Sequence, residues 1–221
     1  MTDRLEILKT CKAELYSAVI CDTLDSLGLR SQTVAPGLAP LAEDMTIFGY
    51  ARVGLFMPIY HDDAEVNVYE HEIALVDDLK PGEVPIISCN GNLDIAPWGE
   101  LLSTRAQVLE SAGCITDGCV RDVAMIRDMG FPVFSGGRNP VDTKYRGKMM
   151  WYDVPCVIGG VLVNSGDMVV ADHDGIVVIP SERVEEVVAG ALEKVRSENT
   201  VRDELRAGSS LAEVFKKHGI L

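Results

Sequence analysis

The middle of the chain alternates between short apolar runs and segments with helical spacing, and this alternation constrains the fold more than any other feature. The apolar runs at 84–89, 113–116 and 131–135 predict strands, and the segments 98–112 and 120–129 between them predict helices. Strands joined through helices in this way lie parallel in one sheet. The sequence therefore predicts an α/β protein with a parallel core.

The N-terminal part of the chain is predicted to add helices and one more β segment to this core. Helices are expected over 5–15 and from Ser17, as the N-cap, to Gly28, and the β-rich run 45–56 precedes a helical segment at 66–79.

The C-terminal part changes character after residue 153. Short β runs joined by glycine turns predict hairpins or a small barrel, at 154–158, 161–163, 168–171 and 176–179. Ser181 is predicted to cap a long polar helix that ends near Arg206, and Ser209 or Ser210 to cap a last helix ending near Gly219.

Composition and charge limit the class of protein. The chain has 221 residues and a formal net charge of -14, with a sequence pI near 4.6, which argues against binding nucleic acid or an anionic membrane. No apolar run approaches the roughly 20 residues that span a bilayer, and the start lacks a signal-peptide pattern. We expect a single domain in the cytoplasm, with its six cysteines reduced.

The segment Asp117–Asp122 is the main candidate for chemistry, because it follows a predicted strand and opens a helix. Ligands of open α/β folds bind beyond the carboxyl ends of strands, and a helix start adds positive potential there. Arg121 and Asp122 lie side by side at this point. They could instead form a solvated ion pair of little consequence.

A second helix start, around Gly99–Leu102, follows the neighbouring strand. If the two strand ends converge, the amides of Leu101 and Leu102 could hold a substrate carboxylate and Arg121 could bind or polarise an α-oxo group. Asp122 could then anchor Mg2+ or Mn2+ with water ligands. Glu100 could assist as a nearby carboxylate, or could be an acidic residue favoured at a helix N-terminus.

Other motifs support weaker hypotheses. His61-Asp62-Asp63, with Glu65, His71 and Glu72, could be a metal cluster or a solvated acidic loop. Cys119 could be a nucleophile or a small packed residue. Gly136-Gly137 is predicted as a turn, and the chain lacks the full phosphate-loop pattern and any G-x-G-x-x-G fingerprint.

Taken in order, several motifs resemble the RraA-like family over most of the chain. They are Trp98–Leu102, Asp117–Asp122, Phe131–Phe134, Gly159–Val161, Ser165–Asp167 and Ala171–Ile176. The resemblance implies a swivelling β/β/α fold, with residues 1–221 as one domain and 181–221 as a helical tail at an oligomer interface. It also implies a homotrimer or homohexamer with active sites shared between protomers.

The family includes a regulator of RNase E and class II aldolases that act on 4-hydroxy-4-methyl-2-oxoglutarate and 4-carboxy-4-hydroxy-2-oxoadipate. The resemblance assigns substrate and metal binding to Arg121 and Asp122, substrate contacts to Gly99–Leu102, and a metal-water contact to Glu198 of an adjacent protomer. The regulator branch lacks an aspartate after the motif arginine, so Asp122 favours the enzyme branch. The segments 61–72 and 142–146 do not match the aldolases.

The expected function is therefore a Mg2+- or Mn2+-dependent lyase that cleaves a 4-hydroxy-2-oxo acid through a pyruvate enolate. Arg121 would share the enolate charge with the cation, Glu100 or Glu198 would hold a water that acts as base, and oxaloacetate decarboxylation would be a side activity. The alternatives are a decarboxylase of another β-keto or sugar acid and a non-catalytic regulator that binds a protein.

Overall fold

A curled mixed sheet forms the centre of the protein, in a computed structural model that describes residues 3–61 and 64–220. Its main strands run in the order β1-β5-β4-β3-β2-β9-β10, and β6 also pairs with β2. Their bounds are β1 Ala39–Pro40, β2 Ile47–Pro58, β3 Glu83–Ser88, β4 Cys114–Val120, β5 Val133–Arg138, β6 Gly147–Tyr152, β9 Met168–Ala171 and β10 Ile176–Ile179.

The parallel core predicted from the sequence is confirmed. Strands β2, β3, β4 and β5 pair in parallel, with Val53 opposite Ile86 and Ile86 opposite Ile115. The remaining pairings of β2 are antiparallel: its first residues pair with β9 and its last with β6. This long strand therefore joins the parallel core to the C-terminal β segments.

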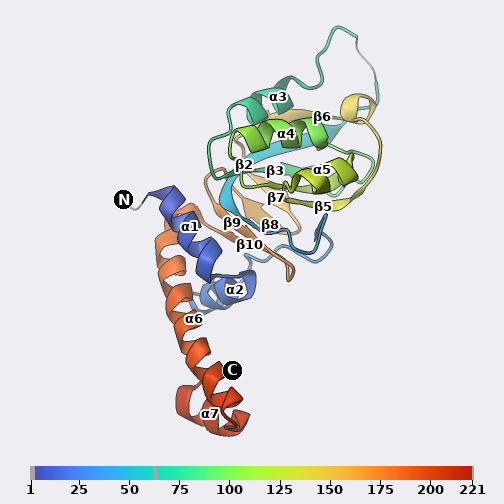
Figure 1. The fold of residues 1–221 in the computed structure, drawn as a ribbon. Helices are drawn as coiled ribbons and strands as arrows, with labels where there is room; N and C mark the ends of the chain where they lie inside the picture. Colours follow the sequence, from blue (N-terminus) through green and yellow to red (C-terminus); the bar gives the residue numbers. More distant parts are fainter. Residues whose placement is uncertain (1–2, 62–63, 221) are drawn as a thin grey trace.

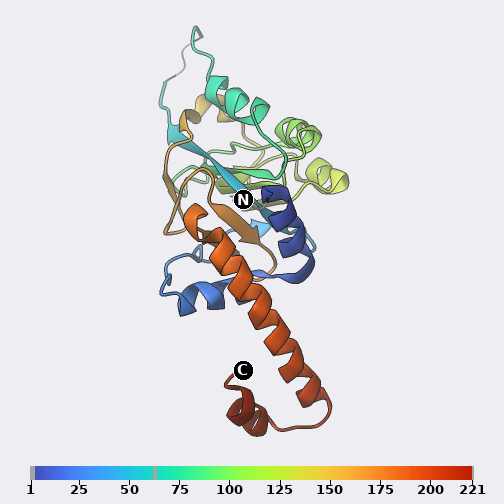
Figure 2. The same ribbon diagram turned by 90° about the vertical axis from the view of Figure 1, so that its left-hand side faces the viewer.

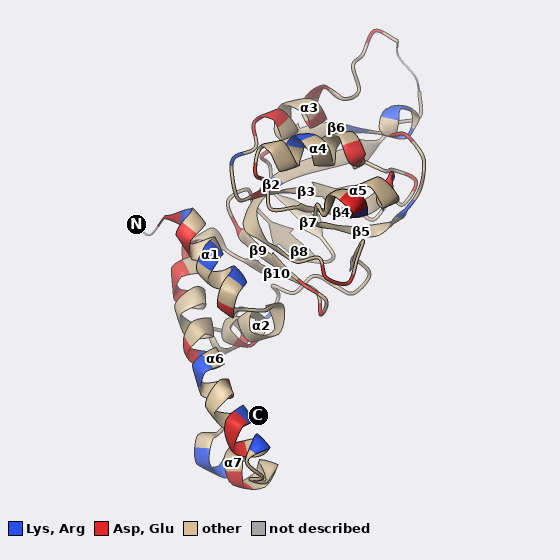
Figure 3. Cartoon of the chain, viewed as in Figure 1, with Lys and Arg blue, Asp and Glu red and all other residues tan. Residues whose placement is uncertain are grey.

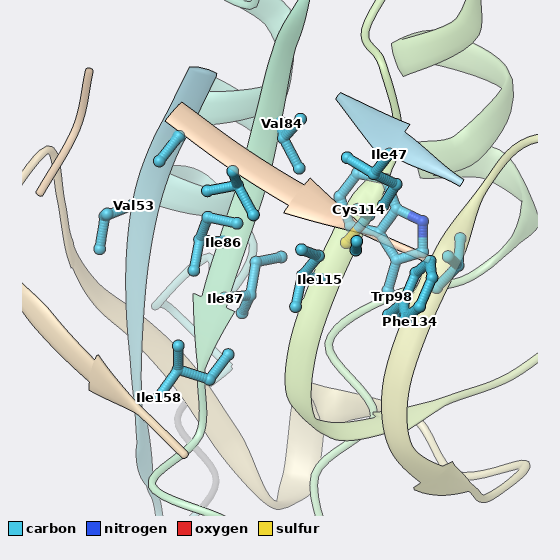
Figure 4. Close-up of a cluster of buried hydrophobic side chains, with 14 of the residues drawn as sticks. Ile47, Val53, Val84, Ile86, Ile87, Trp98, Cys114, Ile115, Phe134 and Ile158 are labelled. Atoms are coloured by element: carbon cyan, nitrogen blue, oxygen red, sulfur yellow. The ribbon is translucent and has the colours of Figure 1, made fainter. Parts of the chain in front are cut away.

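Both faces of the parallel strands are covered, which explains their continuous apolar runs. Helices α3 (Glu70–Asp77), α4 (Glu100–Val108) and α5 (Val123–Met129) lie along one side of the sheet (Figure 1). Ile158, from the separate hairpin of β7 (Cys156–Ile158) and β8 (Val161–Val163), belongs to the same buried cluster as Ile87 and Ile115 (Figure 4).

A second apolar cluster joins the two ends of the chain. Helices α1 (Arg4–Glu14), α2 (Ser17–Ser26) and α6 (Val184–Arg206) pack against β9 and β10. The C-terminal half of α6 then extends away from the sheet and carries α7 (Leu211–His218) at its far end (Figures 1 and 2). Acidic and basic residues both line this extension (Figure 3).

Most predicted elements are present, with shifted ends. Ser210 caps α7 in a capping box with Glu213, as expected for one of the two serines. Tyr16, and not Ser17, is the N-cap of α2. The backbone N–H and the hydroxyl of Ser17 both donate to the Asp172 carboxylate, at 2.7 and 2.6 Å. The long C-terminal helix begins at Val184, after the 3-10 turn η2 (Ser181–Arg183).

The structure differs from the sequence-based expectations at three places around the parallel core. Strand β4 continues through Val120, and α5 begins at Val123 rather than at Val120. Gly136 and Gly137 are not a turn but part of β5, where Gly137 pairs with Cys119 and prolongs both strands. Strand β6 was not predicted; four of its six residues, Lys148 among them, are only partly buried or exposed.

No helix among the described residues is both long enough and apolar enough to cross a lipid bilayer. All six cysteines are unpaired thiols.

Candidate active site

The two charged residues of the main motif lie where β4 ends. Asp122 adopts a left-handed backbone conformation with φ of 57°, which is uncommon for a residue other than glycine, and α5 begins at the next residue. Strained backbone of this kind costs free energy and is found most often at functional sites. Here it turns the chain sharply between the strand and the helix.

The segment that leads into α4 runs alongside this strand end. Trp98 forms a parallel bridge with Val120, and the Arg121 N–H donates to the Trp98 carbonyl at 3.0 Å. The Glu100 N–H then donates to Asp122 Oδ2 at 3.2 Å. The two strand ends therefore converge, as the sequence predicted.

Gly99 leaves room at this junction for the side chains of Arg121 and Asp122. Its φ of -154° is open to any residue, but a Cβ atom would come within 2.8 Å of Asp122 Oδ2 and 3.2 Å of Arg121 Cγ. Any side chain at position 99 would thus push both charged groups away from the start of α4.

The first turn of α4 offers free hydrogen-bond donors. The N–H groups of Leu101 and Leu102 have no hydrogen-bond partner among the residues that the structure describes. Unpaired amides at a helix N-terminus attract anions. They are suited to a carboxylate, as expected from the sequence.

A cavity of about 230 Å³ brings these groups together. Its wall is mainly apolar, and the only Lys or Arg side chain among the described residues that line it is Arg121. The lining residues are Tyr69, Glu72, Ile73, Ala96, Pro97, Trp98, Gly99, Leu101, Leu102, Arg121, Asp122 and Thr143.

A larger hollow of about 500 Å³ lies between the segment 33–43 and the turn that joins β9 to β10. The Asp172 carboxylate, which lines this hollow, already accepts hydrogen bonds from Ser17 at the start of α2. Because this hollow lacks the pair of strand ends and the free helix amides, we place the candidate active site at the smaller cavity.

The Arg121 guanidinium is held from two sides but is not saturated. Its Nε lies 3.7 Å from Asp122 Oδ2, and its Nη1 lies 3.3 Å from Asp142 Oδ2. The Nη2 atom has no partner among the described residues. A third donor group is therefore free for an anionic ligand.

Asp142 is itself fixed, just before the 3-10 turn η1 (Thr143–Tyr145). The Tyr69 hydroxyl donates to its Oδ1 at 2.7 Å, and the Lys144 N–H donates to the same atom at 3.0 Å. Burial alone would raise the pKa of Asp142, but these hydrogen bonds and the Arg121 charge outweigh it and lower the pKa. Asp142 therefore stays ionised beside Arg121.

Glu72 adds an unusual carboxyl group to the wall. Its exposed fraction is 4%, and it has no hydrogen-bond partner among the described residues. Burial, and then the Asp142 charge, raise the pKa of Glu72 to about 8, although Arg121 opposes the shift. Near neutral pH this side chain is mostly a neutral acid.

Asp117, the first residue of the motif, serves the loop rather than the cavity. Its carboxylate accepts hydrogen bonds from the Cys89 N–H, from the Gly91 N–H at 3.0 Å and from the Ser88 hydroxyl at 3.3 Å. Burial raises the pKa of Asp117, and these hydrogen bonds work against that shift. The contacts fix the loop that leads from β3 towards α4.

The sequence placed Gly99, Leu101, Leu102, Arg121 and Asp122 in one site, and all five line the cavity. It did not single out Tyr69, Asp142 or Thr143, and it considered Glu72 only as a metal ligand. With Leu75 and Val76, Glu72 occupies positions i, i+3 and i+4, and all three are buried. Glu70 has Ile73 and Ala74 at i+3 and i+4, so the spacing in the sequence does not single out Glu72.

Glu100 and Glu198 lie outside the cavity wall of their own chain. Glu100 Oε1 accepts a hydrogen bond from Thr104 at 2.7 Å. Glu198 lies on α6, where its Oε2 accepts a hydrogen bond from the Tyr16 hydroxyl at 2.6 Å. A role for Glu198 in the site of a neighbouring protomer stays a prediction.

The metal cluster considered for 61–72 is not present in the part of the chain that the structure describes, and Asp62 and Asp63 lie outside it. His71 Nδ1 lies 3.2 Å from the Met149 carbonyl, and its ring packs against Tyr152. Cys119 is 3% exposed, and burial, then the Asp94 charge, raise the pKa of its thiol. Cys119 is therefore a packed residue.

A divalent cation fits Asp122 as its single protein anchor. The side chain is 40% exposed, and its Oδ1 accepts no hydrogen bond from the described residues. Mg2+ keeps several waters and is often held by only one or two carboxylates, and Mn2+ accepts the same oxygen ligands.

The chain belongs to the RraA-like family, whose model, Aldolase/RraA, matches residues 17–178. A structure of RraAS2 from Streptomyces coelicolor, described as an unusual member of the RNase ES inhibitor RraA protein family, has the same fold. The two are 29% identical with a TM-score of 0.78, over 89% of this chain and 96% of the other. The predicted fold class is thereby confirmed.

Two curated relatives are similar over most of the chain. Protein DlpA of Legionella pneumophila is 30% identical over 96% of this chain, and the chain spans only 33% of its length. A protein of Halalkalibacterium halodurans named "Putative 4-hydroxy-4-methyl-2-oxoglutarate aldolase" is 31% identical over 79% of this chain and 77% of its own. Of these two relatives, only the second has an activity in its name.

Proposed function

We propose that the protein is a divalent-metal-dependent lyase that cleaves a carbon–carbon bond next to a 2-oxo acid. The observation that carries the proposal is the junction of Arg121, Asp122 and the free amides of α4 at one cavity. Relatives named as aldolases of 4-hydroxy-4-methyl-2-oxoglutarate support the choice of substrate type.

Binding of the substrate follows from the donors in the cavity. The free N–H groups of Leu101 and Leu102 would hold the carboxylate of the 2-oxo acid, and the Arg121 guanidinium would bind its oxo group. The apolar wall would exclude water and so strengthen these contacts.

Bond cleavage moves an electron pair onto the oxo acid and leaves a pyruvate enolate. A bound Mg2+ or Mn2+, anchored by Asp122, would supply additional positive charge for that oxygen. Arg121 is held beside the same position by Asp122 and Asp142, so its charge is in place before the reaction begins.

A base must also remove the proton of the C4 hydroxyl. Glu100 of the same chain, or Glu198 of a neighbouring protomer in a homotrimer or homohexamer, would do so through a water molecule. Oxaloacetate loses carbon dioxide through the same enolate without this step. We therefore expect oxaloacetate decarboxylation as a side activity. We further propose that the enzyme is cytoplasmic, where its free thiols would stay reduced.

The test is a substrate panel with purified protein and added Mg2+ or Mn2+. Release of pyruvate from 4-hydroxy-4-methyl-2-oxoglutarate would support the proposal. Turnover of a different β-keto or sugar acid alone would keep the site and change the substrate.

A regulator that binds a protein partner is the second candidate. The observation in its favour is the shared fold with RraAS2, at 29% identity. This candidate requires a stable complex with an RNase E-type partner and no metal-dependent turnover of any 2-oxo acid.

A further inference from the structure

Glu72 is a carboxyl group in a position that calls for an apolar side chain. It shares one face of α3 with Leu75 and Val76, which are 0% and 2% exposed. Glu70, two residues earlier in the same helix turn, is exposed instead. Burying an unpaired carboxyl group is costly, so such a group is a strong candidate for function.

The contacts around Glu72 do not give it a structural role. Other buried carboxylates of this chain are tied to the backbone: Asp117 accepts N–H bonds from Cys89 and Gly91, and Asp167 accepts them from Asn164 and Ser181. Glu72 has no comparable bond among the described residues, and it lines the same cavity as Arg121.

Burial is the main reason that Glu72 is neutral, and its charged neighbours act in opposite directions. Asp142, ahead of η1, opposes ionisation, while Arg121, at the end of β4, favours it. The Tyr69 hydroxyl, at the N-cap of α3, and the buried thiols of Cys89 and Cys114 also interact with Glu72. Arg121 is already shared by Asp122 and Asp142, so a third carboxylate would leave the cavity strongly negative.

One step of the proposed reaction, the protonation of the enolate carbon, has no residue assigned to it so far. Cleavage leaves an enolate whose C3 carbon must take up a proton before pyruvate is complete. Arg121 cannot supply it, because its guanidinium keeps its protons in proteins. Gly99, Leu101 and Leu102 offer only amides.

We propose that Glu72 is the general acid that protonates C3 of the enolate; this inference rests on the proposed lyase function. The electron pair of the enolate double bond takes the proton, a C3–H bond forms and the O–H bond of Glu72 breaks. The carboxylate is then reprotonated by water. No oxidant or reductant is needed, because a proton transfer leaves the overall oxidation level of the enolate unchanged.

The decisive experiment separates bond cleavage from protonation of C3. In D2O with Mg2+ or Mn2+, the wild-type protein should exchange the methyl hydrogens of pyruvate for deuterium, because the protonation of C3 is reversible. The exchange is followed by proton NMR, and oxaloacetate consumption by its absorbance. The variants are Glu72→Gln, Glu72→Met as a second choice for a buried helix face, and Glu70→Gln as the exposed control.

We expect Glu72→Gln and Glu72→Met to lose about 100-fold or more of the exchange rate, the range typical of a general acid. Oxaloacetate consumption should fall less than about 5-fold, since the enol can leave and pick up its proton in water. Glu70→Gln should match the wild type. Rescue by Glu72→Asp of part of the exchange would support the role further.

Two results would overturn the role of Glu72 and leave the lyase function standing. Exchange at the wild-type rate in both variants would show that another group protonates C3, and equal losses of exchange and consumption would show a role in binding or packing. A wild-type protein that neither exchanges pyruvate nor consumes oxaloacetate would overturn the lyase function itself, and the role of Glu72 with it.

Discussion

Two arginines of this chain sit among carboxylates, and they differ in how many of their donors are used. Arg52 places all three guanidinium nitrogens on Asp78, Glu83 and Asp153, at 2.9 to 3.3 Å, with 12% of its side chain exposed. Arg121 has two ion pairs, at 3.3 and 3.7 Å, one unused nitrogen and 35% exposure.

The difference separates a structural arginine from a binding one. Arg52, on β2, ties that strand to the end of α3, to the start of β3 and to the residue after β6. It has no donor left for a ligand. Arg121 is held firmly enough to be oriented while a donor stays free at the cavity.

The largest predicted effect comes from exchanging each arginine for alanine. Arg121→Ala should lower kcat/KM for oxaloacetate by about 1000-fold or more, since it removes a preorganised charge, while stability changes by less than about 1 kcal/mol. Arg52→Ala should do the reverse, losing roughly 2 to 4 kcal/mol of the free energy of unfolding with little effect on the turnover of folded protein. Steady-state kinetics and urea denaturation measure both. Equal losses of activity in the two variants would break the comparison.

Asp122 tests the metal side of the same site. Asp122→Ala should abolish metal-dependent turnover of oxaloacetate and of 4-hydroxy-4-methyl-2-oxoglutarate, a loss of about 100-fold or more. Calorimetric titration should also show weaker binding of Mn2+. The matched control is Asp128→Ala, at an exposed position of α5. Retained metal-dependent turnover in Asp122→Ala would remove the metal role from this residue.

The buried carboxyls Glu72 and Asp117 extend the comparison to acids. The pKa of Glu72 is raised from 4.5 to about 8 in the folded protein. The folded state therefore binds the Glu72 proton more tightly than the unfolded state does. This contribution to the free energy of unfolding is fully present below pH 4.5 and is lost as the pH rises through 8. Glu72→Gln should leave stability at pH 5 nearly unchanged and raise it by roughly 3 to 5 kcal/mol at pH 9.

Asp117→Asn should behave differently from Glu72→Gln. Its two carboxylate oxygens accept bonds from backbone N–H groups, and an amide offers only one acceptor atom. We expect a loss of about 1 to 3 kcal/mol at both pH values, measured by the same urea series.

A Glu72→Gln variant that shows the same pH dependence as the wild type would contradict the account of its burial.

The smallest predicted effect concerns the support of Arg121. Tyr69→Phe removes the hydroxyl that donates to Asp142 at 2.7 Å. KM for oxaloacetate should rise by about 3- to 10-fold with a smaller change in kcat, because one hydrogen bond that orients Asp142 is lost. Tyr145→Phe, at a 58% exposed position, is the control. An unchanged KM in Tyr69→Phe would show that Arg121 needs no support from this side.

The sequence predicted the part of the site that follows from strand topology. Arg121 and Gly99 follow neighbouring parallel strands, whose carboxyl ends meet at one edge, so their convergence could be expected. Strand ends were less predictable. Val120 and Gly137 extend β4 and β5 through pairings that depend on tertiary contacts.

The other wall of the cavity could not be predicted in the same way. Tyr69 and Asp142 are 73 residues apart and meet only because α3 and η1 both lie against the end of the sheet that β6 extends. Glu70 and Glu72 look alike in the sequence, and only the packing of α3 shows which of them is buried.

The central claim is that the cavity at Arg121 and Asp122 supports metal-dependent formation of a pyruvate enolate. The most direct test measures pyruvate release from oxaloacetate and from 4-hydroxy-4-methyl-2-oxoglutarate by EDTA-stripped protein, before and after Mg2+ or Mn2+ is added. We predict turnover of both substrates that depends on the added metal. No turnover of either substrate with any added metal would contradict the claim and favour a regulator that binds a protein partner.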